Sequence, residues 1–167
     1  MMKRMILAVG ILSMAFVLQA QKFGHISSEA LLQIMPEYDS AQAELQQLQQ
    51  HYEQEIERIQ VEINKKIEEF NQNEATMSEL IKEAKAAEVQ ELQMRLQNYS
   101  QTAQQDLQQQ SQIVIQPVME KARGAIDEVA RENGLIYVFD IAQGNPVYTS
   151  EESLDLFPLV KAKLGVQ

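Results

Sequence analysis

The feature that most constrains the fold is residues 37–116, a run of 80 positions without a single glycine or proline. All six glycines and all four prolines of the 167-residue chain lie outside this run. Glycine and proline break helices, whereas the alanine, glutamate, glutamine, lysine and leucine that dominate the run favour them. A helix-forming run of this length is typical of a coiled coil rather than of one ordinary globular helix.

Apolar side chains recur every three or four positions in the run, in two successive series. This is the pattern of helices that bury one face against each other. The first series is Ala41, Leu45, Leu48, Tyr52, Ile56, Ile59, Ile63, Ile67 and Phe70, and the second is Met77, Ile81, Ala84, Glu88, Leu92, Leu96, Tyr99, Ala103 and Leu107. Paired outward from the middle, their residue numbers sum to 147 or 148, as two antiparallel helices require. The series predict a helical hairpin that reverses near Glu74, with Glu88 as a polar rung.

The residues between the two series carry signals for the reversal. Residues 71–73 (Asn-Gln-Asn) are expected to end the first helix, because asparagine tolerates a left-handed cap. Thr76 and Glu79 are spaced as a capping box, which would begin the second helix. The tip is therefore expected at residues 71–76. Each helix would hold roughly 35–40 residues, which at about 1.5 Å per residue gives a hairpin on the order of 50–60 Å long.

The segment before the hairpin predicts one strand and one short helix. Residues 22–27 have the composition of a strand. Ser28 is placed to cap a short helix over 29–35. Pro36 would then open the first helix of the hairpin as a first-turn proline.

The segment after the hairpin predicts a mixed structure. Pro117 is expected to open a separate helix that Gly134 closes. Residues 135–141 form the clearest strand of the chain, and residues 147–149 are expected to return beside it. Asp155 is placed to cap a final helix.

The predicted fold class is α+β and mostly α: a long antiparallel helical hairpin (37–116) inserted in a small β-containing body (21–36 and 117–167). A body of this size has a marginal core by itself, and open sheet edges invite pairing with another chain. We therefore predict an obligate oligomer assembled through the body. The candidate oligomerisation residues are Phe23, Ile26, Leu135, Tyr137, Phe139, Ile141 and Val147.

Residues 1–20 read as a secretory signal peptide. Lys3 and Arg4 form a basic start, and residues 5–18 form an apolar core that is shorter than the roughly 17–25 residues of a membrane span. Cleavage is expected after Ala20, and an uncleaved anchor is the alternative. The chain has no cysteine, so neither a disulfide nor a lipidated cysteine can form. The signal peptide predicts that the chain is secreted.

The charge and the polar residues argue against several classes of function. The chain carries −10, and the hairpin run alone holds 15 acidic and 6 basic residues, so nucleic acid is an unsuitable partner. The two histidines, His25 and His51, are far apart in the sequence and do not predict a metal site or a general base. Asp140 ends a strand without an evident partner. No catalytic residue, cofactor or metal is predicted, and the chain is not expected to be an enzyme.

The surface of the hairpin offers candidate contacts for another protein. Val61 and Met94 lie outside the two apolar series that form the seam between the helices, whereas Phe70 and Met77 belong to the seam and are expected to pack in the hairpin. All four are candidate contacts for a bound protein, or client. Glutamines cluster near the open end of the hairpin, at 46–47, 49–50, 104–105 and 108–110. They form either a solvated, uncharged face or an adaptable, weakly polar wall of a cavity.

Short segments on both sides of the hairpin carry a family resemblance. They are Phe23-Gly24-His25-Ile26, Leu31-Leu32 and Met35-Pro36-Glu37-Tyr38 before it, and Ala125-Ile126-Asp127-Glu128-Val129-Ala130, Asn133-Gly134-Leu135-Ile136-Tyr137-Val138-Phe139-Asp140, Val147-Tyr148 and Asp155-Leu156 after it. In this order, and with the hairpin between them, they resemble the Skp (OmpH-like) family of periplasmic chaperones. The resemblance covers the chain that would follow the signal peptide.

The resemblance implies a homotrimer whose bodies share a β-barrel-like core and whose three arms enclose a cavity. It implies ATP-independent holding of unfolded outer-membrane proteins in that cavity, with no cofactor. The best-known members are strongly basic, whereas this chain is acidic, which argues against contact with lipopolysaccharide or an anionic membrane. The alternative, from another class, is a coiled-coil spacer or adaptor that docks a fixed envelope partner through the hairpin tip. Residues 71–75 are plain and polar, which favours the chaperone.

Overall fold

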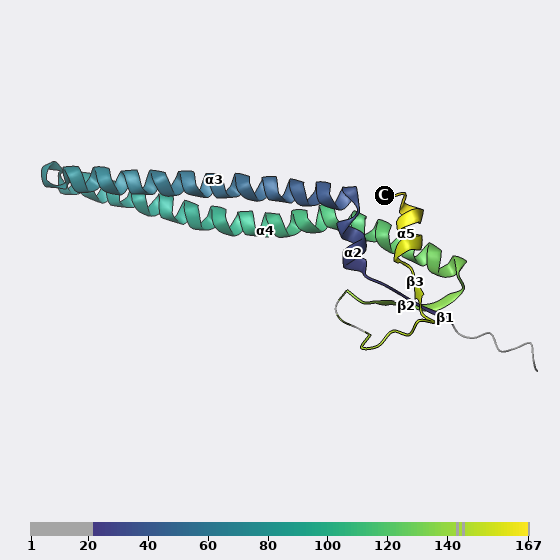
Figure 1. The fold of residues 1–167 in the computed structure, drawn as a ribbon. Helices are drawn as coiled ribbons and strands as arrows, with labels where there is room; N and C mark the ends of the chain where they lie inside the picture. Colours follow the sequence, from purple (N-terminus) through teal and green to yellow (C-terminus); the bar gives the residue numbers. More distant parts are fainter. Residues whose placement is uncertain (1–21, 143, 145, 167) are drawn as a thin grey trace, which may run out of the picture. The chain divides into compact units, whose positions relative to one another are not determined.

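The computed structural model describes residues 22–142, 144 and 146–166, so the expected signal peptide lies outside the described residues (Figure 1). The elements in chain order are β1 (Lys22–Ile26), α2 (Ser28–Gln33), α3 (Pro36–Asn73), the 3-10 helix η1 (Glu74–Thr76), α4 (Glu79–Glu132), β2 (Leu135–Asp140), β3 (Leu154–Asp155) and α5 (Phe157–Leu164). The chain divides into two compact units. We call Met35–Glu120 the arm, and the described residues up to Ile34 and from Lys121 on the body.

The arm is the predicted antiparallel helical hairpin (Figure 1). Pro36 is in the first turn of α3, where its missing N–H costs nothing. The centre of the seam is a cluster of three buried side chains, Ile59, Ile63 and Leu92. Val89, Leu96 and Tyr99 pack on this cluster and are partly buried. Since each buried Ile or Leu stabilises by about 1.5–3 kcal/mol, these contacts hold the two helices together.

The pairing of α3 with α4 is displaced by about one helical turn from the predicted register. The rings of Tyr52 and Tyr99 are 6.1 Å apart, and Lys66 Nζ lies 2.5 Å from Glu88 Oε1. The residue numbers of these pairs sum to 151 and 154 instead of 148. A shift close to 3.6 residues returns the same helix face to the seam, so the apolar pattern alone could not exclude it. The reversal lies beyond Glu74 because η1 begins there.

Two polar contacts on the seam help to define this register. Glu88, predicted as a poor rung opposite Ile59, instead accepts hydrogen bonds from Lys66 and Lys85, which lower its pKa. The Tyr52 hydroxyl donates to Asp106 Oδ2 at 2.5 Å. This hydrogen bond, followed by burial and by the charge of Asp106, raises the pKa of Tyr52 to about 12. Such contacts form at one register only, so they add the specificity that the apolar residues lack.

The tip is built differently from the prediction, although it lies close to residues 71–76. α3 ends at Asn73 without a left-handed residue, since no non-glycine residue with positive φ occurs in the described chain. The capping box at Thr76 is also wrong, because its hydroxyl donates to the Asn73 carbonyl oxygen at 2.9 Å. Ser78 caps α4 instead, with its Oγ accepting from the Ile81 N–H at 3.4 Å. A serine one position before the helix can reach this N–H, whereas Thr76 belongs to η1.

α4 runs through Pro117, so the separate helix predicted there is wrong. A proline inside a helix removes one backbone hydrogen bond and crowds the preceding turn. The helix continues because the helix-forming residues on both sides keep their own bonds. Gly134 ends it as predicted, with φ of 66° and its N–H donating to the Arg131 carbonyl oxygen.

The body contains a three-stranded parallel sheet in the order β2-β1-β3. The strand predicted at 147–149 is wrong: Leu154–Asp155 pairs with β1 instead, and Val147 is 97% exposed. A parallel partner needs a longer connection than a hairpin turn, and residues 141–153 supply it. The buried side chains of the body are Ile26, Leu31, Ala122, Ala125, Val129, Leu156 and Val160.

The helix caps of the body differ from the prediction by one position. Ser27, not Ser28, caps α2, with its Oγ accepting from the Ala30 N–H at 3.2 Å. Ser28 is thereby free to bind Asp140, which the sequence left without a partner. Leu156, not Asp155, is the N-cap of α5, and the Asp155 carboxylate one position earlier accepts from the Phe157 N–H at 2.9 Å. Gly165 ends that helix with φ of 69°.

Asp140 joins the end of β2 to the start of α2. Its carboxylate accepts from the Ser28 hydroxyl, from the Ser28 N–H at 3.1 Å and from the Ala142 N–H at 3.0 Å. Burial opposes the charge, but these hydrogen bonds outweigh burial and lower the pKa of Asp140. A carboxyl with a lowered pKa stabilises the fold above its ordinary pKa, and this contribution is lost as pH falls through the lowered value.

Replacing Asp140 by asparagine is expected to destabilise the body by about 1 kcal/mol near neutral pH, given its exposure. The difference from the unsubstituted protein should shrink as pH falls below about 3.9, the ordinary value for aspartate. Hydrogen exchange of the α2 and β2 amides, followed from neutral to acidic pH, measures the difference. Asp127→Asn is the control, because the carboxylate of Asp127 has no partner in the described chain. A difference that is constant with pH would contradict the role of the Asp140 charge.

Candidate functional site

One face of the β1–β2 pair carries three aromatic side chains, which we call the aromatic face: Phe23, Tyr137 and Phe139. Their ring centroids lie 6.4 Å (Phe23–Tyr137), 6.2 Å (Phe23–Phe139) and 6.3 Å (Tyr137–Phe139) apart. They remain 39%, 64% and 44% exposed, respectively. Contiguous exposed aromatic rings on a sheet are typical of a surface that contacts another protein.

A β-bulge assembles the aromatic face. Lys22 pairs with Leu135 but Phe23 pairs with Tyr137, so Ile136 is the extra residue. Simple alternation would put Leu135 on the same side of the sheet as Tyr137. The bulge turns Leu135 instead to the side of Gly24, where a Cβ on Gly24 would lie only 2.7 Å from its Cδ1.

The bulge therefore divides the predicted oligomerisation residues into groups. Phe23, Tyr137 and Phe139 come together on the aromatic face. Ile26 is 2% exposed and Leu135 half-buried, so these two contribute to the interior of the body. Ile141 (36% exposed) and Val147 (97%) lie beyond the end of β2. The period-2 pattern could not separate the groups, because a bulge leaves no clear signal in a strand of six residues.

His25 lies on the same side of the sheet as Phe23 and bonds to the segment before β3. Its Nδ1 is 2.9 Å from the Ser153 Oγ. Asp155 is the residue opposite His25 in β3, but its carboxylate accepts from the Phe157 N–H. A catalytic triad would need that carboxylate to orient the imidazole. The hydrogen bond between His25 and Ser153 therefore links β1 to the segment just before β3.

The arm presents its candidate client contacts in two different ways. Val61 and Met94 are 60% and 54% exposed, so both are accessible on the helix surface. Phe70 and Met77 are half-buried near the tip. Phe70 and Met77 are thus partly used in the seam, whereas Val61 and Met94 remain available for contact.

The tip region is more apolar than residues 71–75 alone indicate. Leu80 is 78% exposed, Ile81 48% and Ile67 37%. The apolar series predict Ile67 and Ile81 in the seam. Because both lie close to the reversal, the facing helix covers them only in part. Leu80 belongs to neither apolar series, and this pattern indicates that its side chain faces outward.

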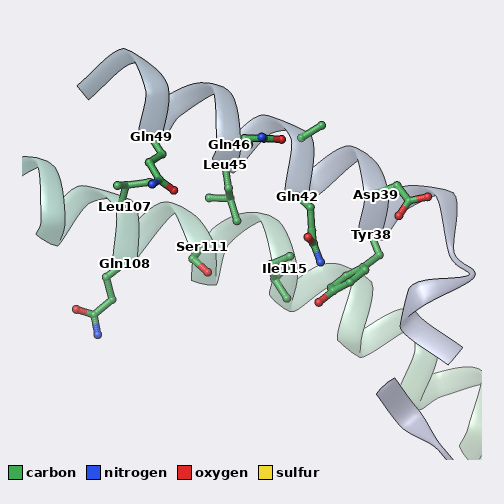
Figure 2. A pocket seen from close by; sticks show the side chains of 11 residues that line it. Tyr38, Asp39, Gln42, Leu45, Gln46, Gln49, Leu107, Gln108, Ser111 and Ile115 are labelled. Carbon is green, nitrogen blue, oxygen red and sulfur yellow. The ribbon is translucent and has the colours of Figure 1, made fainter. Parts of the chain in front are cut away.

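The arm also contains a groove between α3 and α4, with a volume of about 980 Å³. Figure 2 shows Tyr38, Gln42 and Leu45 of α3 pointing toward α4, where Ser111 and Ile115 lie. The groove forms because the apolar series of α4 ends at Leu107 and the position one helical turn later is Ser111. Ser111 has a small side chain and leaves space that a leucine would fill.

The glutamine clusters are divided between this groove and open surface. Gln46, Gln49 and Gln108 line the groove, together with Gln42. Gln47 and Gln50 are exposed and do not line it. All of these glutamines are exposed, and only a part of the clusters borders the groove.

The fold and these surfaces define a class of protein: a small body with a parallel sheet and an aromatic face, combined with a long helical-hairpin arm. The chain belongs to the OmpH-like family, because residues 22–164 match the family described as "Outer membrane protein (OmpH-like)". No curated protein matches the chain.

A solved structure has the same fold. It is that of a candidate outer membrane chaperone (OmpH-like) from Caulobacter crescentus CB15, with a TM-score of 0.73 and 16% sequence identity. The match covers 86% of this chain and 83% of that one. At this identity the likeness establishes the shared fold. Within the described residues, no helix combines the length and the apolar character needed to span a bilayer.

Proposed function

We propose that this protein is a periplasmic holdase chaperone, which holds unfolded outer-membrane proteins without ATP. The observation that carries the proposal is the distribution of apolar side chains on the arm. The seam uses most of them internally, and Val61, Met94 and Ile113 stay exposed as single side chains on a largely polar surface. Many weak contacts of this kind give avidity without a specific pocket, which suits clients of varied sequence.

We also propose that three copies assemble through their aromatic faces. β2 and β3 form the two edges of a short sheet, and no further strand of the described residues pairs with either edge, so both are available to another chain. Burying three exposed aromatic rings would add the core that a small body lacks. The OmpH-like family membership supports this assembly.

The test is the aggregation of a denatured outer-membrane β-barrel protein diluted into buffer without nucleotide. The purified protein should suppress light scattering at a small molar excess, because it shields exposed strands until they fold into membranes. Val61→Asp combined with Met94→Asp should weaken the protection several-fold, since both side chains are accessible. Gln47→Asp with Gln50→Asp adds the same charge elsewhere on the arm and is the control. No protection by the unsubstituted protein would exclude the holdase function.

The exposed tip supports a second candidate function, that of an adaptor whose arm docks a fixed envelope partner. Ile67, Leu80 and Ile81 give the tip the apolar patch that such docking needs. Leu80→Ser with Ile81→Ser separates the two functions. An adaptor would lose a single discrete cross-linked partner in the cell envelope, whereas protection of denatured clients would be unchanged. Loss of protection alone would assign the tip to client holding.

A further inference from the structure

We propose that the groove between α3 and α4 binds an extended segment of client polypeptide whose side chains are apolar or cationic. This inference rests on the proposed holding function and names the site and the chemistry of the segment held. The groove of about 980 Å³ is at the upper end of the usual range for ligand sites, about 300–1,000 Å³. It is therefore large enough for several residues of a peptide.

The groove offers contacts both for the side chains and for the backbone groups of an extended strand. Leu45, Leu107 and Ile115 provide half-buried apolar surface for alternate side chains. The amides of Gln42 and Gln46 have no hydrogen-bond partner in the described residues. Each can donate to a backbone carbonyl and accept from a backbone N–H.

The spacing of these amides fits an extended chain. Gln42 and Gln46 are four residues apart on α3, which corresponds to a rise of about 6 Å. Two residues of a strand advance by roughly 6.4–6.8 Å. A helix would be a poor occupant, because its backbone groups already bond to one another.

Charge selects among extended segments. Asp39 is the one charged residue that lines the groove, and its carboxylate has no ion-pair partner among the described residues. The surrounding run 37–116 holds 15 acidic and 6 basic residues. An acidic segment would be repelled, and so would the arm of a second copy of this chain. A segment with a lysine or arginine beside its apolar residues would instead pair with Asp39.

The direct experiment uses the full protein and a fluorescent peptide of alternating valine and threonine that ends in lysine. Fluorescence anisotropy should show binding, and Gln42→Ala with Gln46→Ala should weaken it about tenfold. Gln47→Ala with Gln50→Ala is the matched control and should leave the affinity unchanged. Equal affinity for both double variants would overturn the groove as the site.

The preference of the groove for a cationic segment is measured with a second peptide. A peptide that ends in glutamate should bind at least about tenfold more weakly than the lysine peptide. Asp39→Asn should remove most of this preference. A preference that persists in Asp39→Asn, or no preference at all, would contradict the pairing with Asp39.

A photo-cross-linker at position 46 identifies the occupant. Adducts with the lysine peptide at position 46, and none at position 50, support the proposal; adducts with a second copy of the chain overturn it. The inference and the holdase function can fail separately. Normal suppression of aggregation by Gln42→Ala with Gln46→Ala, together with unchanged peptide binding, removes the groove and keeps the holdase. Peptide binding without suppression by the unsubstituted protein removes the holdase and keeps the groove.

Discussion

Replacing Tyr137 and Phe139 together by aspartate is expected to convert the proposed trimer to a monomer. Their rings are 64% and 44% exposed in one chain and stand beside Phe23. Burying charged carboxylates without partners at an interface costs several kcal/mol, more than the loss of two aromatic contacts alone. Light scattering coupled to size-exclusion chromatography measures the mass directly.

A matched control separates the interface from general damage to the body. Leu159 on α5 is 39% exposed, the same fraction as Phe23, but it does not belong to the aromatic face. Leu159→Asp should therefore keep the oligomer. Circular dichroism of all variants should retain the helical signal of the arm. A double variant that remains an oligomer of unchanged mass would show that the copies meet elsewhere.

Gly24→Ala is expected to destabilise the body by about 1–3 kcal/mol, the usual cost of overpacking a core. The added Cβ would lie 2.3 Å from Leu156 Cδ1, 2.7 Å from Leu135 Cδ1 and 3.1 Å from the Leu154 carbonyl oxygen. Leu156 is 0% exposed, so its side chain cannot turn into solvent without displacing the residues that cover it. The substitution should therefore push β1 and β3 apart or force Leu156 out of its rotamer.

Hydrogen exchange provides the local measurement for this prediction. The Leu156 N–H donates to the His25 carbonyl oxygen, and the Ile141 N–H donates to the Ile26 carbonyl oxygen. Both amides should exchange faster in Gly24→Ala. Gly124→Ala is the opposite control, because no atom lies within 4 Å of its added Cβ and α4 is helical there. It should stabilise α4 by up to about 1 kcal/mol. A destabilisation of equal size in both variants would show that close packing at Gly24 is not the cause.

Local signals in the sequence account for much of the fold. The arm could be predicted because a long run free of glycine and proline repeats its apolar residues at helical spacing. Gly134 was found as a helix end because it takes a left-handed conformation that favours glycine. β2 was found because four β-branched and aromatic residues follow one another at positions 136–139.

The errors lie where two local solutions have nearly equal energy. Ser27 and Ser28 are both good caps, and Asp140, 112 positions beyond Ser28, decides between them. Pro117 usually begins a helix, but inside α4 it costs one hydrogen bond that the long helix tolerates. Residues 147–149 have strand composition, yet Leu154–Asp155 takes the edge of β1.

By itself, the sequence determined that this protein has a helical hairpin, where it reverses within a few residues, and that a strand lies on each side of it. These features depend on contacts between near neighbours in the chain. The tertiary structure alone decided the hairpin register, the bulge that separates Leu135 from the aromatic face, and the groove beside Gln42. Each of these depends on residues distant in the sequence, and a displacement of one helical turn or one strand residue leaves the local pattern almost unchanged.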